Sequence, residues 1–132
     1  MHRSRIIYRA VVGALILVLL LPVSALGIAR DVVVERGKVW VVRNTPYSQT
    51  RWATVDGTVL PYTTKAQKAA APRTGYRTDC SGFVSMCLGL TDYYNRPMSL
   101  TTRSLSPSYV TTTTQATLLP GDVMLKRGSH VV

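Results

Sequence analysis

The sequence has 132 residues, with 16 Lys and Arg against 6 Asp and Glu, which gives a formal net charge of +10. This length is enough for one small domain and excludes several independent domains within the sequence. The basic residues are scattered singly and form no known nucleic-acid-binding motif, so we do not expect DNA or RNA as a partner.

Residues 1–27 have the order of a secretory leader. Three arginines precede an apolar run over 10–21, and Pro22 and several small residues follow it. This order is typical of a signal peptide, and 25–27 fits the small-x-small pattern of a cleavage site. The alternative is an uncleaved membrane anchor, because the apolar stretch approaches the roughly 20 residues that span a bilayer. Both interpretations place residues 28–132 outside the cytoplasm, secreted or associated with the cell wall, with membrane contact only through an uncleaved leader.

The remainder of the chain stays basic. Three of the net positive charges belong to the leader arginines, so residues 28–132 carry about +7. Basic surfaces attract polyanions, and the nearest polyanions outside a cell are cell-wall polymers and anionic lipid headgroups.

The first element after the leader is a valine-rich stretch over 31–43. Valine favours strands by propensity, but Asp31 at its start and Asn-Thr-Pro at 44–46 are typical helix boundaries. We therefore predict a helix here. An irregular stretch follows, and the Lys/Ala-rich residues 65–71 predict a second, short helix.

The motif Asp-Cys-Ser-Gly-Phe-Val at 79–84 indicates a cysteine at the start of a helix. Asp79 is a good N-cap, because its carboxylate accepts unpaired N–H groups of the first turn. Cys80 would then lie at the positive end of the helix dipole, where the thiolate is favoured. We expect the small Ser81 and Gly82 to leave room for a substrate above the sulfur. The alternative is a buried small hydrophobe or half of a disulfide.

The two cysteines of the sequence are Cys80 and Cys87. On one helix they are roughly 10 Å apart along the axis, whereas a disulfide needs Cα atoms within about 7 Å. We therefore predict that they do not pair, that Cys87 packs in the core, and that Cys80 stays free for catalysis.

The C-terminal part begins with a stretch rich in Thr and Ser, in which 101–109 predict a short helix. Leu-Leu-Pro-Gly at 118–121 is a turn signal, and strands are expected over 122–126 and 129–132. His130 is the only histidine after the leader. A lone histidine in a strand is more often structural, but here it is the only imidazole available to serve Cys80 as a base.

Taken together, the motifs at 79–84, 118–123 and 129–132 resemble, in identity and order, those of the NlpC-type cysteine peptidases that cut peptidoglycan. Upstream, Trp40 and Thr-Pro-Tyr-Ser-Gln at 45–49 are similar to the helix and the substrate-side tyrosine that precede the cysteine motif in that family.

The resemblance implies an α+β, papain-like fold in which the nucleophile helix packs on an antiparallel sheet, with neither metal nor cofactor. It implies Cys80 as nucleophile and His130 as general base. Tyr47, Asp79 and Ser81 would lie on the substrate side. Acyl transfer through a covalent thioester is the chemistry of such a pair.

Several functions stay open within this resemblance. The substrate would be peptidoglycan stem peptides or another cell-wall polymer, and peptidase, amidase and acyltransfer to an amine use the same residues. The competing class is a non-catalytic, basic cell-wall-binding module on the same fold.

The family also carries a third polar residue on the strand after the histidine, whereas this sequence stops at Val132. We therefore expect 28–132 to be an NlpC-like domain truncated at its C-terminus, with an incomplete sheet.

Overall fold

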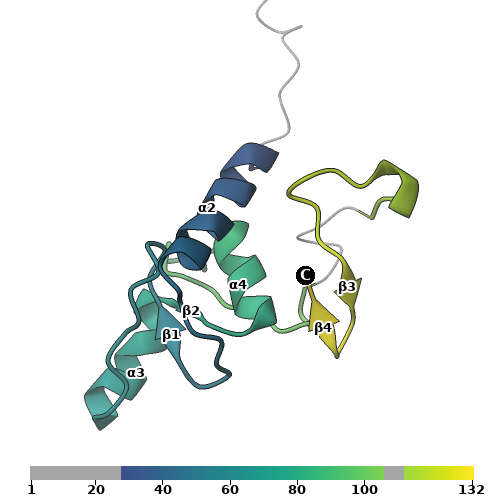
Figure 1. Cartoon of the computed structure of the whole chain (residues 1–132). Helices are drawn as coiled ribbons and strands as arrows, with labels where there is room; N and C mark the ends of the chain where they lie inside the picture. The colour runs from purple at the N-terminus through teal and green to yellow at the C-terminus, as the bar shows by residue number, and fades with distance from the viewer. Residues whose placement is uncertain (1–27, 106–111) are drawn as a thin grey trace, which may run out of the picture.

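The computed structural model describes residues 28–105 and 112–132, so the candidate leader lies outside the described residues. Within these ranges the fold is α+β, with three α-helices and two small antiparallel sheets (Figure 1). In chain order the elements are α2 (Arg30–Val42), β1 (Trp52–Ala53), α3 (Lys65–Thr74), β2 (Tyr76–Arg77), α4 (Cys80–Cys87), the 3-10 turn η1 (Gln115–Thr117), β3 (Leu125–Lys126) and β4 (His130–Val131). None of the helices in the described ranges is both long and apolar enough to span a bilayer.

The valine-rich stretch is the helix α2, as predicted. Its buried residues are Val33, Gly37 and Trp40, which are three or four positions apart and form one stripe along the helix. Val41 and Val42 are exposed. The helical period therefore decides which of the many valines enter the core.

Helix α2 packs on α4 through a close approach at Gly37. A methyl group added at Gly37 would lie 3.2 Å from the Phe83 ring and 3.3 Å from the sulfur of Cys87. One turn further along, the rings of Trp40 and Phe83 lie with centroids 5.9 Å apart. The first hydrophobic core forms around this contact and consists of Val33, Trp40, Ala53, Tyr76, Met86 and Cys87.

The sheet of β1 and β2 supports the start of α4. Trp52 pairs with Arg77 and Ala53 with Tyr76. The predicted second helix is α3, which extends beyond the expected 65–71 to Thr74 and begins with a capping box. After α3 the chain enters β2, which runs antiparallel to β1 and leads directly into the cysteine motif.

The two predicted C-terminal strands form the hairpin of β3 and β4, although the ladder covers only two residues of each. Leu125 pairs with Val131 and Lys126 with His130. Backbone bonds between Met124 and Val132, in both directions at 2.7 and 3.1 Å, continue the pairing. The second core, made by Val84, Leu105 and Val131, fixes the hairpin against α4.

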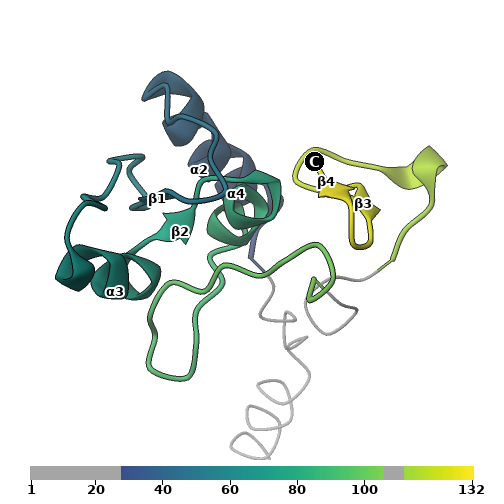
Figure 2. The ribbon, with the colours of Figure 1, turned by 90° about the horizontal axis from the view of Figure 1, so that it is seen from below.

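Helix α4 lies between the two sheets, with the β1–β2 pair on one side and the hairpin on the other (Figures 1 and 2). The expected single antiparallel sheet is thus two separate pairs of strands among the described residues. The predicted helix over 101–109 is a single turn at 101–105, closed by the bond from the Leu105 N–H to the Thr101 carbonyl at 2.9 Å. Residues 106–111 lie outside the described ranges.

Candidate functional site

The cysteine stands at the first position of α4, as the sequence predicts. Asp79 is the N-cap, and its carboxylate accepts the N–H of Gly82 at 2.9 Å. The other carboxylate oxygen accepts the Nε–H of Arg77 at 2.6 Å. Asp79 is buried. The cap is therefore part of a partly buried ion pair that holds the start of α4 in place.

Arg77 is the residue that sequence reasoning missed in this arrangement. Its guanidinium also lies 3.2 Å from the hydroxyl of Ser81, which in turn lies 3.4 Å from Asp79. Arg77 precedes Asp79 by two positions, and a strand turns residues i and i+2 to the same side. The spacing of Arg77 and Asp79 is visible in the sequence. The contact between them could be recognised only once the structure showed that β2 ends at Arg77.

The two thiols are free and have different environments. Cys80 is partly exposed, and its own N–H has no hydrogen-bond partner among the described residues. Cys87 is 6 % exposed, and burial raises the pKa of its thiol to about 11. The predictions of an unpaired Cys80 and a core-packed Cys87 are confirmed.

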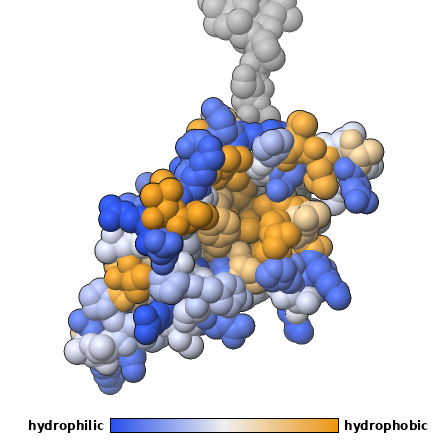
Figure 3. All heavy atoms as spheres, viewed as in Figure 1, coloured by the Kyte–Doolittle hydropathy of each residue, from blue (hydrophilic) through white to orange (hydrophobic). Residues whose placement is uncertain are grey.

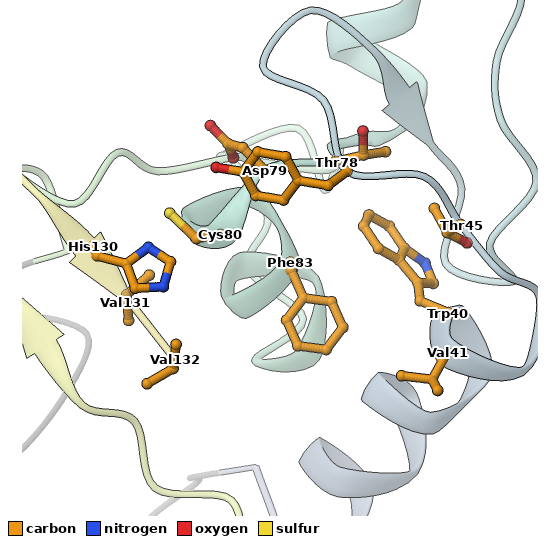
Figure 4. A pocket seen from close by; sticks show the side chains of 11 residues that line it. Trp40, Val41, Thr45, Thr78, Asp79, Cys80, Phe83, His130, Val131 and Val132 are labelled. Carbon is orange, nitrogen blue, oxygen red and sulfur yellow. The ribbon is translucent and has the colours of Figure 1, made fainter.

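His130 enters the site from the opposite side, on β4. The next residue, Val131, is 1 % exposed and is packed in the second core. Because side chains alternate along a strand, burial of Val131 turns His130 outward, toward solvent. Figure 4 shows the His130 ring and the Cys80 sulfur near one another at one end of a pocket.

This pocket has a volume of about 370 Å³ and is formed by α2, the start of α4 and the end of β4. Figure 3 shows apolar side chains gathered on this face, between α2 and the hairpin. Aromatic and aliphatic groups line most of it, and Asp79 and His130 lie near Cys80 at one end. The lining residues are Trp40, Val41, Thr45, Tyr47, Thr78, Asp79, Cys80, Phe83, His130, Val131 and Val132.

Tyr47 lines the pocket from the loop after α2. The next residue, Ser48, is tied to Thr78 by two bonds, one from the Ser48 N–H at 3.1 Å and one from the Thr78 hydroxyl at 3.2 Å. Thr78 precedes the cap residue, so these bonds place Tyr47 beside the start of α4. Its side chain remains 66 % exposed and available to a ligand.

Ser81 is not among the residues that line the pocket, although the sequence suggested that it faces the substrate. It is 2 % exposed and lies against the Arg77–Asp79 pair. Gly82 likewise makes no room for a substrate. A methyl group there would lie 1.9 Å from the Arg77 carbonyl oxygen, so the glycine is needed where α4 meets β2.

The imidazole of His130 makes no hydrogen bond with any described residue, and none joins it to Cys80. Of the five predicted site residues, the structure brings Tyr47, Asp79, Cys80 and His130 to one pocket, whereas Ser81 is buried and does not line it. Phe83 and Thr78 were not predicted as site residues and complete its walls.

No family model matches this chain, and neither the curated proteins nor the solved structures contain one with significant similarity to it.

Proposed function

We propose that this chain is an exported cysteine hydrolase of the NlpC type, with a papain-like arrangement of nucleophile and base, that cuts peptide or amide bonds of bacterial peptidoglycan. The observation that carries the proposal is the meeting of Cys80 and His130 in one pocket. They are 50 positions apart in the sequence and come from different elements. A partly exposed thiol at a capped helix N-terminus, in one pocket with the only imidazole after the leader, supports nucleophilic catalysis by this pair.

The reaction follows from these groups. His130 takes the thiol proton, and the Cys80 sulfur attacks the carbonyl carbon of the scissile bond. The N–H of Cys80, which has no hydrogen-bond partner among the described residues, is available to stabilise the oxyanion. The C–N bond then breaks, the leaving amine takes the proton from His130, and a thioester remains. Water, activated by the same imidazole, adds to the thioester and releases a carboxylic acid and the free thiol.

The remaining side chains of the pocket fit a peptide substrate. Tyr47 offers an exposed phenol beside the reacting atoms, while Trp40 and Phe83 form an apolar wall. Asp79 is occupied by the cap and by Arg77, so we assign it to holding the helix rather than to binding a substrate amine. Export and a cell-wall location are part of the proposal and rest on the leader sequence.

The test is digestion of purified peptidoglycan by the full chain, with the released fragments identified by mass spectrometry. Cys80→Ala should lower the cleavage rate by about 10³-fold or more, and His130→Ala by about 10²-fold or more. Cys87→Ala is the matched control: it removes the same atom from a buried site and should leave cleavage by the folded protein unchanged.

Equal cleavage by the wild-type and Cys80→Ala chains would refute the assignment of the nucleophile. A wild-type chain that sediments with insoluble peptidoglycan, but releases no fragment from it, would identify the non-catalytic binding module instead.

A further inference from the structure

The hairpin that carries His130 also carries a lysine directly opposite it. Lys126 and His130 are cross-strand partners in the β3–β4 register. Directly opposed residues of an antiparallel pair point to the same face, with Cβ atoms about 5 Å apart. The other pair, Leu125 and Val131, faces the core. Lys126 therefore shares the open face of the hairpin with the histidine.

Two more cations lie at the same end of the hairpin. Arg127 follows Lys126 at the turn, and the side chain of Arg103 reaches the turn from the neighbouring loop. A methyl group at Gly128 would lie 3.3 Å from the Arg103 Nε atom. The Gly128 N–H also lies 3.4 Å from the Thr102 carbonyl oxygen. We call Arg103, Lys126 and Arg127 the hairpin cations; all three are exposed.

No Asp or Glu side chain neutralises the hairpin cations. All six acidic residues of the chain lie in the described ranges. Four of them form ion pairs elsewhere: Glu35 with Lys38, Asp79 with Arg77, Asp92 with Arg96, and Asp122 with Arg30. The other two accept hydrogen bonds from neighbouring residues. Asp31 accepts from the Val32 N–H, and Asp56 accepts from the hydroxyls of Thr54 and Thr58.

We propose that Lys126 forms an anion subsite beside the reacting atoms and selects substrates that carry a free carboxylate within about one residue of the scissile bond. The inference rests on the proposed function, because it takes Cys80 as the nucleophile. Lys126 supplies the cation closest to His130 in register, while Arg103 and Arg127 raise the positive potential around it. The apolar pocket on the other side of His130 would hold the uncharged part of the substrate.

The experiment compares two reagents that differ only in charge near the reacting carbon. Iodoacetate carries a carboxylate where iodoacetamide carries a neutral amide. Both alkylate the thiolate by displacing iodide, and peptide mass mapping reports modification at Cys80 alone. The measured quantity is the ratio of the iodoacetate rate to the iodoacetamide rate for the full chain.

Lys126→Gln should lower this ratio by roughly three- to tenfold, which is the range for one charge pair about 6 Å apart at a solvated site. The control is Lys65→Gln, which removes an equal charge from α3 and should leave the ratio unchanged. High salt should lower the wild-type ratio toward that of the Lys126→Gln variant, because it screens exposed charges.

An equal ratio in the wild-type and Lys126→Gln chains would overturn the subsite, whatever the peptidoglycan assay shows. Slowing of the iodoacetate reaction by inorganic phosphate, but not by acetate at equal ionic strength, would overturn the carboxylate assignment in favour of a phosphate ligand. A Cys80 that reacts with neither reagent would overturn the proposed nucleophile and this subsite together. Peptidoglycan cleavage tests the proposed function separately, so the two failures are distinguishable.

Discussion

At the scale of single residues, the two cysteines of α4 have opposite properties because they stand at opposite ends of the helix. Cys80 stands at the exposed start of α4, whereas Cys87 faces α2 and is buried against Gly37. Desolvation disfavours the charged thiolate and raises the pKa of Cys87 to about 11. The same residue type is therefore partly exposed at one end of the helix and packed in the core at the other.

This difference predicts selective alkylation. At pH 7 only about 10⁻⁴ of the Cys87 thiol would be ionised, since each pH unit below the pKa lowers the thiolate fraction tenfold. Iodoacetamide should modify Cys80 in the native chain and reach Cys87 only after unfolding in guanidinium chloride. Peptide mass mapping of the native and the unfolded sample shows which cysteine is modified in each. Modification of Cys87 in the native chain as fast as Cys80 would contradict the burial described above.

At the scale of elements, the position of Cys80 depends on the junction between β2 and α4. Two features hold that junction: the Asp79 cap with its Arg77 partner, and the absence of a side chain at Gly82. The first turn of α4 can approach the strand only because nothing projects between them.

Gly82→Ala should therefore destabilise the fold, although alanine normally favours a helix. Its methyl group would lie 1.9 Å from the Arg77 carbonyl oxygen, and relief of a backbone clash costs about 2 kcal/mol or more. Urea unfolding followed by circular dichroism measures the loss.

The matched control is Gly37→Ala in α2. There the added methyl group meets only side-chain atoms, at 3.2 and 3.3 Å, and the gain in helix propensity of about 1 kcal/mol offsets the crowding. A Gly82→Ala chain as stable as the Gly37→Ala chain would show that the two elements have room to separate.

At the scale of the whole molecule, the site exists only because the C-terminal hairpin is docked on the helical part. Apolar packing of Val131 against Val84 and Leu105 supplies one attachment. The ion pair between Asp122 and Arg30 supplies another and joins the start of the hairpin to α2. Cys80 and His130 therefore lie on two parts of the chain that these contacts hold together.

The second attachment makes docking of the hairpin depend on pH. Hydrogen bonding from the Leu119 N–H, and then from Arg30, lowers the pKa of Asp122 below its ordinary value. A carboxyl whose pKa is lower in the folded state stabilises that state when ionised, and the contribution disappears as the pH falls through the folded-state pKa. Below about pH 4, the peptide 122–132 should lose protection in hydrogen–deuterium exchange, after correction for intrinsic rates.

Asp122→Asn should remove this loss of protection on acidification, because it lacks the titrating group. Asp92→Asn is the control, since the Asp92–Arg96 pair lies within one loop and does not contact the hairpin. An unchanged pH response in the Asp122→Asn chain would show that another group controls docking.

The sequence by itself determined the local features of this protein. Local properties of residues a few positions apart predict Asp79 as a cap, Cys80 at a helix start and the two C-terminal strands. They also exclude a disulfide between Cys80 and Cys87. Such local preferences act whatever the rest of the chain does, which is why α2, α4 and the two C-terminal strands were found where they were expected.

Only the tertiary structure decided what those elements do together. Ser81 and Gly82 were expected to border the substrate, but the direction of β2 relative to α4 turned both toward Arg77. The register of the hairpin, fixed by burial of Val131, placed Lys126 beside His130. A helix face or a strand register is chosen by the apolar surface that it buries against a distant segment, and the amino-acid order within the element does not specify that partner.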